Sequence, residues 1–401
     1  MSQPGPTRHP RSSSSSPLAQ PTLLVPPPGT PPQPAAPIPD LPRVRRTGAG
    51  VVWLLGVLAL LLAVLVAYFL AFLGPGASVA GMLLAFLPLA GVFLALRAID
   101  RWEPEPRSLV LFALAWGAVA SVVIALLVDL VLTLALGMTD PIATDVFRAV
   151  VQAPVVEELA KGLGVLLVLV VGRRAFDGPV DGLVYGGLIG AGFAFTENIQ
   201  YFAIAVIEGG AAEASTVFFL RGIMSPFAHV MFTALTGFAV GIAVRRGARG
   251  GGVFPAWLLG LLGAVALHAV WNGSAVFGDF FGLYLMLQVP LFILFVLGML
   301  ALRREEARLT GLRLDEYAAQ GWFTTDEVRM LATGPGRRAA LKWAARLPGD
   351  GPARMRAYIR EATALAAARQ RLVSGRDPRA AVEERMLLQR VVAARSALLG
   401  R

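Results

Sequence analysis

Long apolar runs separated by short polar segments dominate the chain between residues 51 and 302. A run of about 20 apolar residues matches the thickness of the hydrocarbon core of a bilayer and predicts a membrane-spanning helix. The runs place spans at 51–73, 78–96, 108–136, 150–171, 181–207, 218–244, 253–276 and 281–302. The pattern therefore predicts an all-α, polytopic membrane protein with about eight transmembrane helices.

The two flanks of this apolar region have a different composition. Residues 1–46 are rich in Pro and Ser and cannot bury enough apolar surface to fold, so they predict a disordered tail. Residues 303–401 are rich in Arg, Ala and Leu, and they predict a helical region. The expected organisation is a tail at 1–46, an eight-span domain at 47–302 and a helical C-terminal region at 303–401.

Basic residues gather in alternate loops between the predicted spans. One set of loops has thirteen of them, whereas the other set has only Arg148 and Arg221; the thirteen are Arg43, Arg45, Arg46, Arg97, Arg101, Arg107, Arg173, Arg174, Arg245, Arg246, Arg249, Arg303 and Arg304. Cytoplasmic loops of membrane proteins carry an excess of Lys and Arg. Both termini are therefore expected in the cytoplasm, which agrees with an even number of spans in a cell-membrane protein.

Composition narrows the possible chemistry. The chain is 56% hydrophobic and 15% charged, and its net charge is +10. Membrane topology accounts for the positive charge in the tails and short loops, so the charge does not indicate a nucleic-acid partner. The chain has no cysteine, which excludes disulfides, thiolate metal ligands and a cysteine nucleophile.

Four predicted spans carry polar side chains that are costly in hydrocarbon and are therefore functional candidates. These are Glu157, Glu158 and Lys161 in the fourth span, Glu197 and Asn198 in the fifth, His229 in the sixth, and His268 and Asn272 in the seventh. Counted from the outer ends of their spans, the acids and histidines lie roughly 7–10 residues in, which is on the order of 10–15 Å at about 1.5 Å per residue. Helices of opposite direction thus bring acids and imidazoles to one layer.

The residue types suggest hydrolysis by an activated water. A buried carboxylate can act as the general base, and Glu158 is the first choice, followed by Glu157. Alternatively, Glu197, His229 and His268 could hold Zn²⁺ with one position open to water. Asn272 lies four residues after His268 and could donate to an oxyanion, while Lys161 would tune the two glutamates.

Structural interpretations of the same residues remain open. Glu157 and Glu158 could simply pair with Lys161, and a histidine in a membrane helix often forms only a hydrogen bond between helices. Gly182, Gly186 and Gly190 repeat at four-residue spacing, which is typical of helices that approach closely. We interpret this repeat as packing that brings Glu197 against its neighbours.

Taken together, these motifs resemble the PrsW family of intramembrane proteases, which is related to the type II CAAX prenyl proteases. Glu157-Glu158-Leu159-Ala160-Lys161 is similar to the EExxK motif of the family, and Phe193-Ala194-Phe195-Thr196-Glu197 is similar to its FxxxE motif. His229 and the segment from His268 to Asn272 supply the rest of the pattern. The CAAX branch has histidine where this chain has Glu197, so the resemblance favours the PrsW branch.

The resemblance covers about residues 51–302 and implies an endopeptidase that cleaves membrane-anchored protein substrates in the bilayer. In the family these substrates include an anti-sigma factor, which is cut first on its exoplasmic side. The family is classed with metallopeptidases, whereas the CAAX relatives suggest a glutamate base with histidine and asparagine at the oxyanion. Two other functions use comparable residues: a proton- or cation-coupled transporter, and a receptor or scaffold that acts through its C-terminal region.

Overall fold

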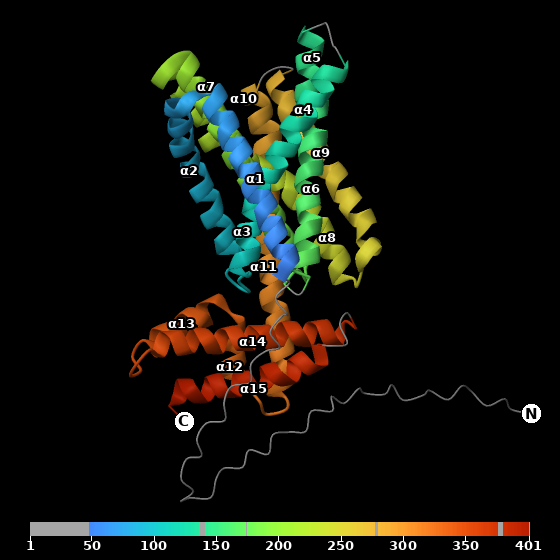
Figure 1. The fold of residues 1–401 in the computed structure, drawn as a ribbon. Helices are drawn as coiled ribbons and strands as arrows, with labels where there is room; N and C mark the ends of the chain where they lie inside the picture. Colours follow the sequence, from blue (N-terminus) through green and yellow to red (C-terminus); the bar gives the residue numbers. More distant parts are fainter. Residues whose placement is uncertain (1–47, 137–140, 174, 277–279, 376–379, 401) are drawn as a thin grey trace, which may run out of the picture. The chain divides into compact units, whose positions relative to one another are not determined.

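The computed structural model describes residues 48–136, 141–173, 175–276, 280–375 and 380–400, and within these ranges it contains helices and no strands (Figure 1). The Pro/Ser-rich segment 1–46, predicted to be disordered, lies outside the described residues. The chain divides into two compact units, and the boundary falls between Arg308 and Leu309. We call residues 43–308 the membrane unit and residues 309–401 the C-terminal unit.

The membrane unit is a bundle of helices, several of which contain a π-helical segment. Its elements are α1 (Gly48–Phe72), α2 (Gly74–Ile99), α3 (Arg107–Ala115), η1 (Trp116–Ser121), α4 (Val122–Leu136), α5 (Pro141–Phe147), η2 (Arg148–Gln152), α6 (Ala153–Val171), α7 (Pro179–Phe218), η3 (Phe219–Met224), α8 (Ala228–Arg245), η4 (Gly250–Val253), α9 (Phe254–Val276), α10 (Phe280–Leu283), η5 (Tyr284–Gln288) and α11 (Val289–Ala318).

Within the described residues, six helical segments are long and apolar enough to cross a membrane, which confirms an all-helical, multi-pass membrane protein. They are Trp53–Phe72, Gly74–Ile99, Arg107–Ala135, Pro179–Arg245, Gly250–Val276 and Phe280–Ala318. The segment Pro179–Arg245 contains both α7 and α8. Helix α6 is apolar except for Glu157, Glu158 and Lys161, and these charges set it apart from the other six.

One helix end agrees with the sequence-based expectation and one helix start differs from it. The stretch α7 consists of two helices joined by a kink with non-helical backbone at Gly210 (φ 63°), so its first helix ends within three residues of the expected 207. Good helix formers in the segment 211–216 rebuild the helix beyond this kink. The expected span at 218–244 begins instead with η3, and α8 starts only at Ala228 after a turn. His229 therefore lies in the first turn of α8.

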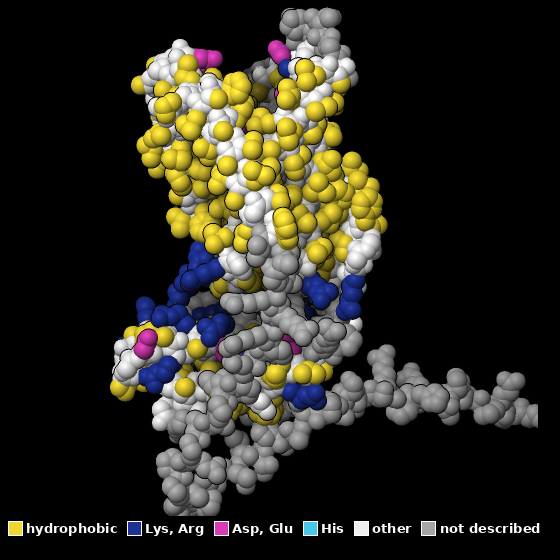
Figure 2. Space-filling view, in the orientation of Figure 1, with side chains coloured by type: hydrophobic (Ala, Val, Ile, Leu, Met, Phe, Trp, Pro, Cys, Tyr) yellow, Lys and Arg dark blue, Asp and Glu magenta, His cyan; other side chains and the backbone are white. Residues whose placement is uncertain are grey.

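The surface of the membrane unit is apolar, as Figure 2 shows by its hydrophobic side chains. Large aliphatic residues on several helices are more than half exposed, for example Leu60 (65%), Leu83 (61%) and Leu259 (71%). A water-soluble protein rarely exposes so large a contiguous apolar area. Lipid contact explains this exposure.

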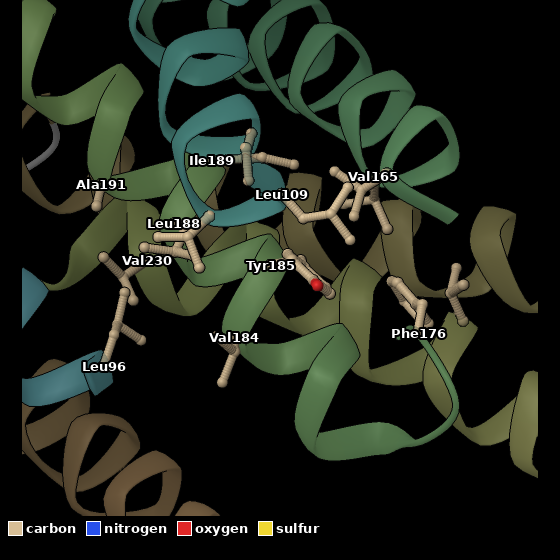
Figure 3. Close-up of a cluster of buried hydrophobic side chains, with 14 of the residues drawn as sticks. Leu96, Leu109, Val165, Phe176, Val184, Tyr185, Leu188, Ile189, Ala191 and Val230 are labelled. Atoms are coloured by element: carbon tan, nitrogen blue, oxygen red, sulfur yellow. The ribbon is translucent and has the colours of Figure 1, made fainter. Parts of the chain in front are cut away.

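The main core of the membrane unit lies between α2, α3, α6, α7, α8 and α9. Figure 3 shows part of it, including Val165 from α6, Tyr185 and Ile189 from α7, and Val230 from α8. The ring of Tyr185 stacks on Phe176 with 5.7 Å between centroids. This core fixes α6, α7, α8 and α9 relative to one another, and these four helices carry the polar residues.

Small residues let α7 and α8 approach each other closely. A Cβ atom at Gly182 would lie 2.0 Å from the carbonyl oxygen of Gly237, and one at Gly186 would lie 2.6 Å from that of Thr233. A Cβ atom at Gly190 would lie 2.3 Å from the carbonyl oxygen of His229. The glycine repeat is therefore the contact surface between the two helices, as the sequence predicts, and it holds His229 beside α7.

Gly190→Ala is expected to destabilise the membrane unit by about 3 kcal/mol or more, because the new methyl group meets backbone atoms that cannot rotate away. The measurement is thermal unfolding of the purified protein in detergent. Gly91→Ala is the matched control, since no atom lies within 4 Å of its Cβ position. Equal melting temperatures of the two variants would contradict the close approach of α7 and α8.

The loop between α2 and α3 is tied to α7 by a buried carboxyl group. Tyr185 donates its hydroxyl hydrogen to Glu105 Oε2 at 2.5 Å, and the backbone N–H of Glu105 donates to Asp100 Oδ1 at 3.1 Å. Burial, followed by the nearby charge of Asp181, raises the pKa of Glu105 from 4.5 to about 11. Glu105 is therefore protonated at neutral pH in the folded protein.

The raised pKa of Glu105 predicts that stability falls as pH rises. Folding takes up a proton between pH 4.5, the ordinary pKa, and pH 11, so the free energy of unfolding should drop by about 1.4 kcal/mol per pH unit. Glu105→Gln, which is always neutral, should remove this slope between pH 6 and 9 and should be more stable than wild type at pH 8. Unfolding curves at several pH values test this, with the exposed Glu208→Gln as control. An unchanged slope in Glu105→Gln would contradict it.

The C-terminal unit packs the end of α11 with α12 (Thr325–Ala332), α13 (Gly334–Ala344), α14 (Gly351–Val373) and α15 (Ala380–Leu399). Its own core includes Leu314, Tyr358 and Leu387. Arg390 of α15 bonds both carboxylate oxygens of Glu361 on α14, at 2.8 and 2.9 Å. This unit therefore has the buried core of a small helical domain.

Candidate active site

Glu158 occupies the centre of the polar cluster between α6, α8 and α9. Its side chain has no solvent exposure, and its Oε1 lies 2.6 Å from Lys161 Nζ. The same oxygen lies 3.0 Å from His268 Nδ1, and Thr233 donates its hydroxyl hydrogen to Oε2 at 3.0 Å. Both carboxylate oxygens of Glu158 therefore have hydrogen-bond donors.

This contact orients the imidazole of His268. An ionised carboxylate only accepts hydrogen bonds, so Nδ1 of His268 carries a hydrogen, and in the neutral imidazole Nε2 then presents a lone pair. Phe232 of α8 lies almost parallel to the ring, with 4.9 Å between centroids and 20° between planes. Hydrogen bonding and stacking together fix the direction in which Nε2 points.

Glu157 lies on the neighbouring face of α6 and is less constrained. Its Oε2 is buried and has no hydrogen-bond partner. The nearest charged or basic atoms are Lys161 Nζ at 3.6 Å and His268 Nε2 at 3.9 Å. These separations are too long for a direct hydrogen bond. An unpaired carboxylate oxygen thus faces an unprotonated imidazole nitrogen across a gap of 3.9 Å.

His229 joins this group to Glu197 on α7. Its Nε2 lies 2.8 Å from Glu197 Oε2, and its Nδ1 lies 3.2 Å from Lys161 Nζ. The ammonium of Lys161 can only donate, so Nδ1 is the acceptor and Nε2 donates to Glu197. The rings of His229 and His268 are nearly perpendicular, with 5.1 Å between centroids.

Two positive charges offset the three acids. Lys161 is completely buried, and its Nζ lies 4.0 Å from the ring centroid of Phe193 in addition to its contacts with the glutamates and His229. Arg221 of η3 bonds Glu197 Oε2 through Nη2 at 2.5 Å and Asn198 Oδ1 through Nε at 2.8 Å. Burial makes these pairs interdependent, because a charge left without its partner is costly there.

Six of the seven residues proposed from the sequence are linked by these contacts; they are Glu157, Glu158, Lys161, Glu197, His229 and His268. Asn272 lies on α9 one turn beyond His268, and its Nδ2 donates to the backbone carbonyl of Ala149 in η2 at 2.8 Å. That contact ties α9 to the start of α6. This hydrogen bond engages Asn272 in helix packing, and its oxyanion role stays a prediction.

The acid that lies with the two histidines is Glu157. One ligand atom each from Glu157, His229 and His268 lie within 4.8 Å of one another. The sequence groups Glu197 with the histidines instead, because all three occupy the same depth. In the structure Glu197 contacts His229 and Arg221, on the side of His229 away from Lys161.

Sequence reasoning misses three contributors to this cluster, namely Arg221, Thr233 and Phe193. From the sequence, Arg221 is assigned to an outer loop. It is the only Lys or Arg between Arg174 and Arg245, and that isolation could have marked it as a partner for the buried acids. Thr233 follows His229 by one helical turn, so the same face of α8 carries both. Phe193 opens the FxxxE motif, one turn before Glu197.

Comparison with known proteins gives matches to one family. Residues 105–296 match the family model described as PrsW family intramembrane metalloprotease. A Protease PrsW of Geobacillus kaustophilus is 28% identical over 144 residues, which are 36% of this chain and 58% of that protein. A Protease PrsW of Clostridioides difficile is 28% identical over 158 residues, which are 39% of this chain and 63% of that protein. No solved structure matches the chain.

The matched region contains every residue of the polar cluster. The chain aligns with about three fifths of the length of each of these two relatives. The resemblance that the motifs indicate is therefore confirmed for residues 105–296.

Proposed function

With residues 105–296 taken as a PrsW-family region, we propose that the chain is an intramembrane endopeptidase that cleaves membrane-anchored protein substrates. One observation carries the proposal: the unpaired Glu157 Oε2 faces His268 Nε2 at 3.9 Å inside a membrane helix bundle. A carboxylate that serves only as a structural partner has its hydrogen bonds satisfied, as Glu158 does. A water between these two acceptors would donate a hydrogen bond to each and keep its lone pairs for attack, which is the position a hydrolytic water needs.

The residues then divide the reaction between them. Glu157 accepts a proton from the water as its oxygen attacks the carbonyl carbon of the scissile peptide bond. The C–N bond then breaks, and the same proton passes from Glu157 to the departing amine. The ammonium of Lys161, 3.6 Å from Glu157, offsets the negative charge that develops.

Glu158 acts through its neighbours in this scheme. The sequence favours Glu158 as the general base, but Lys161, His268 and Thr233 occupy its oxygens. It holds the hydrogen on His268 Nδ1 and thereby keeps Nε2 as an acceptor. Glu157, whose side chain is 14% exposed against 0% for Glu158, is the accessible acid of the pair.

As the alternative to this metal-free scheme, we propose Zn²⁺ at this site with Glu157, His229 and His268 as its ligands, in which case Glu157 would hold the metal instead of taking the proton. Two histidines and a glutamate form a known catalytic zinc donor set. The orphaned Glu157 Oε2 fits a ligand role, and each histidine has a carboxylate on its other side, Glu158 for His268 and Glu197 for His229. When bound, zinc would lower the pKa of a coordinated water. For zinc to bind at Nδ1 of His229, the hydrogen bond between Lys161 and that atom would have to break.

Metal content tests the zinc assignment separately from activity. The purified wild type should contain about one zinc per chain by mass spectrometry, and His268→Ala should contain at least tenfold less. His9→Ala, which changes the third histidine of the chain, is the matched control. Equal zinc content in all three proteins would contradict the zinc site. The mechanism would then be a water activated by glutamate, with no metal.

We also propose that the membrane unit crosses the bilayer eight times with both termini in the cytoplasm. The break at Gly210 divides the segment Pro179–Arg245 into two crossings, because Phe218 and Arg221 beyond it contact Phe202 and Asn198 before it. Helix α6 adds another crossing despite its three charges. Because the chain has no cysteine, single cysteines at Glu213 and Arg249 report their sides directly. Labelling of both positions from the same side would contradict this topology.

The test of the function is cleavage of a single-pass reporter protein by the purified chain in liposomes. The wild type should produce two fragments, His268→Ala should produce none, and His9→Ala should match wild type. A membrane-anchored anti-sigma factor is the reporter of choice, since the family resemblance points to that substrate class. Undiminished cleavage by His268→Ala would refute the assignment of the site.

A further inference from the structure

An apolar groove lies beside the polar cluster, between α8, α9 and the helical segment formed by η5 and α11. Its volume is about 520 Å³, and its lining includes Phe232, Phe238, Val270, Trp271, Met299 and Leu302. All of its lining residues belong to the membrane unit. Val270 is 45% exposed and Gly298 is exposed, so the groove opens on the lipid-facing surface.

One aromatic ring is common to the groove and the candidate active site. Phe232 lines the groove and also stacks on His268, at 4.9 Å between centroids. Trp271 also lines the groove and meets the ring of Phe232 at 6.1 Å and 64°. The lining of the groove therefore shares a residue with the ring contacts of the imidazole.

The outer wall of the groove is the least buried of the candidate spans. Only 6% of the apolar stretch in Phe280–Ala318 is buried, compared with 56% for Pro179–Arg245. Large side chains of α11 make its contacts with the bundle; Phe292 meets Phe227 at 5.2 Å between centroids, and Phe295 packs on the α8–α9 core. Such contacts hold α11 away from α8 and leave room between them.

Two polar residues line the groove: Glu305, which Arg308 binds at 2.7 Å, and Gln288, whose amide oxygen the apolar walls do not satisfy. Gln288 of η5 lines the groove and is only 3% exposed. Its Nε2 donates to Ser274 Oγ at 2.5 Å, whereas its Oε1 has no hydrogen-bond partner. An unpaired amide oxygen in an apolar setting is stabilised by a donor such as a backbone N–H group.

From these features we propose that the groove binds one face of the transmembrane segment of the membrane-anchored substrate and guides it to His268 and Glu157. The inference rests on the proposed protease function. A groove of this size takes the side chains along one face of an apolar helix. A lipid acyl chain would fit the apolar walls, but it offers no donor to Gln288, whereas a peptide that unwinds before cleavage exposes backbone N–H groups.

Filling the groove is the first test. Gly298 lies in the lining, and no atom lies within 4 Å of its Cβ position, so the first carbon of a tryptophan side chain at Gly298→Trp meets no backbone. It should slow reporter cleavage by at least tenfold without lowering the melting temperature. Gly91→Trp on α2 is the matched control, because it is also an exposed, unhindered glycine but lies outside the groove. Equal cleavage by the two variants would refute the proposal.

Photocrosslinking tests binding without relying on cleavage. Benzoylphenylalanine replaces Leu291, which lines the groove, or Leu83, which is 61% exposed on α2, both in the Glu157→Gln background. Irradiation should link the reporter to position 291 and not to position 83. Adducts of lipid alone at position 291 would refute substrate binding there. If position 291 links to the reporter but wild type never cleaves it, substrate binding in the groove is supported and the protease function is contradicted.

Discussion

Glu157→Gln is expected to slow reporter cleavage by about 10²–10⁴-fold, the usual contribution of a general base. The variant should fold normally, because Glu157 Oε2 has no hydrogen-bond partner that the substitution could remove. Glutamine keeps the size of the side chain but cannot accept the proton. Cleavage rates in liposomes and the melting temperature, measured on the same preparations, check both parts of the expectation.

Glu158→Gln separates the two adjacent acids. It should also reduce cleavage, but with a lower melting temperature, since Lys161 and His268 lose their carboxylate partner. If Glu157→Gln retained full activity while Glu158→Gln was inactive and stable, the assignment of Glu157 as the base would be wrong. Glu158 would then be the base, as the sequence alone favours.

Lys161→Met is expected to lower the free energy of unfolding by about 3–5 kcal/mol, the effect of removing one partner from a buried ion pair. Lys161 and Glu158 are both completely buried, so the carboxylate would remain in the bundle without its nearest counter-charge, at 2.6 Å. Methionine retains most of the apolar volume of the side chain. Denaturant unfolding of the purified protein measures the loss.

A double variant checks the cause of that loss. Lys161→Met with Glu158→Gln removes both charges and should recover part of the stability that Lys161→Met loses. Lys342→Met, at an exposed lysine of the C-terminal unit, should leave stability nearly unchanged. A Lys161→Met protein as stable as the Lys342→Met control would show that the buried pair does not support the fold.

The membrane fold was largely predictable because hydrocarbon imposes length and polarity on every span. The glycine repeat at Gly182, Gly186 and Gly190 also predicted a close helix contact, since only small residues permit one. The end of the first helix of α7 was predictable to within three residues of Gly210, whereas the start of α8 was not. The segment 219–227 is apolar enough to continue a span, but it forms η3 and a turn instead.

The members of the polar cluster could be found from sequence, because ionisable residues are rare inside spans. Their pairing could not, since it depends on how each helix is rotated about its axis. Glu157 and Glu158 are adjacent in sequence but point about 100° apart, so only the structure shows which one Lys161 and Thr233 bind. Arg221 and Asn272 show the same limit. Arg221 binds Glu197 although the sequence places it in a loop, and Asn272 donates a hydrogen bond to the carbonyl of Ala149.

The most direct measurement is cleavage of the reporter in water enriched in oxygen-18, followed by mass spectrometry of the fragments. Hydrolysis by wild type should place one oxygen-18 atom in the new C-terminal carboxyl group at a single peptide bond, and Glu157→Gln should form that fragment at least about 100-fold more slowly. A reporter that remains intact with every membrane-anchored sequence tried, or a labelled fragment formed equally by wild type and Glu157→Gln, would contradict the account.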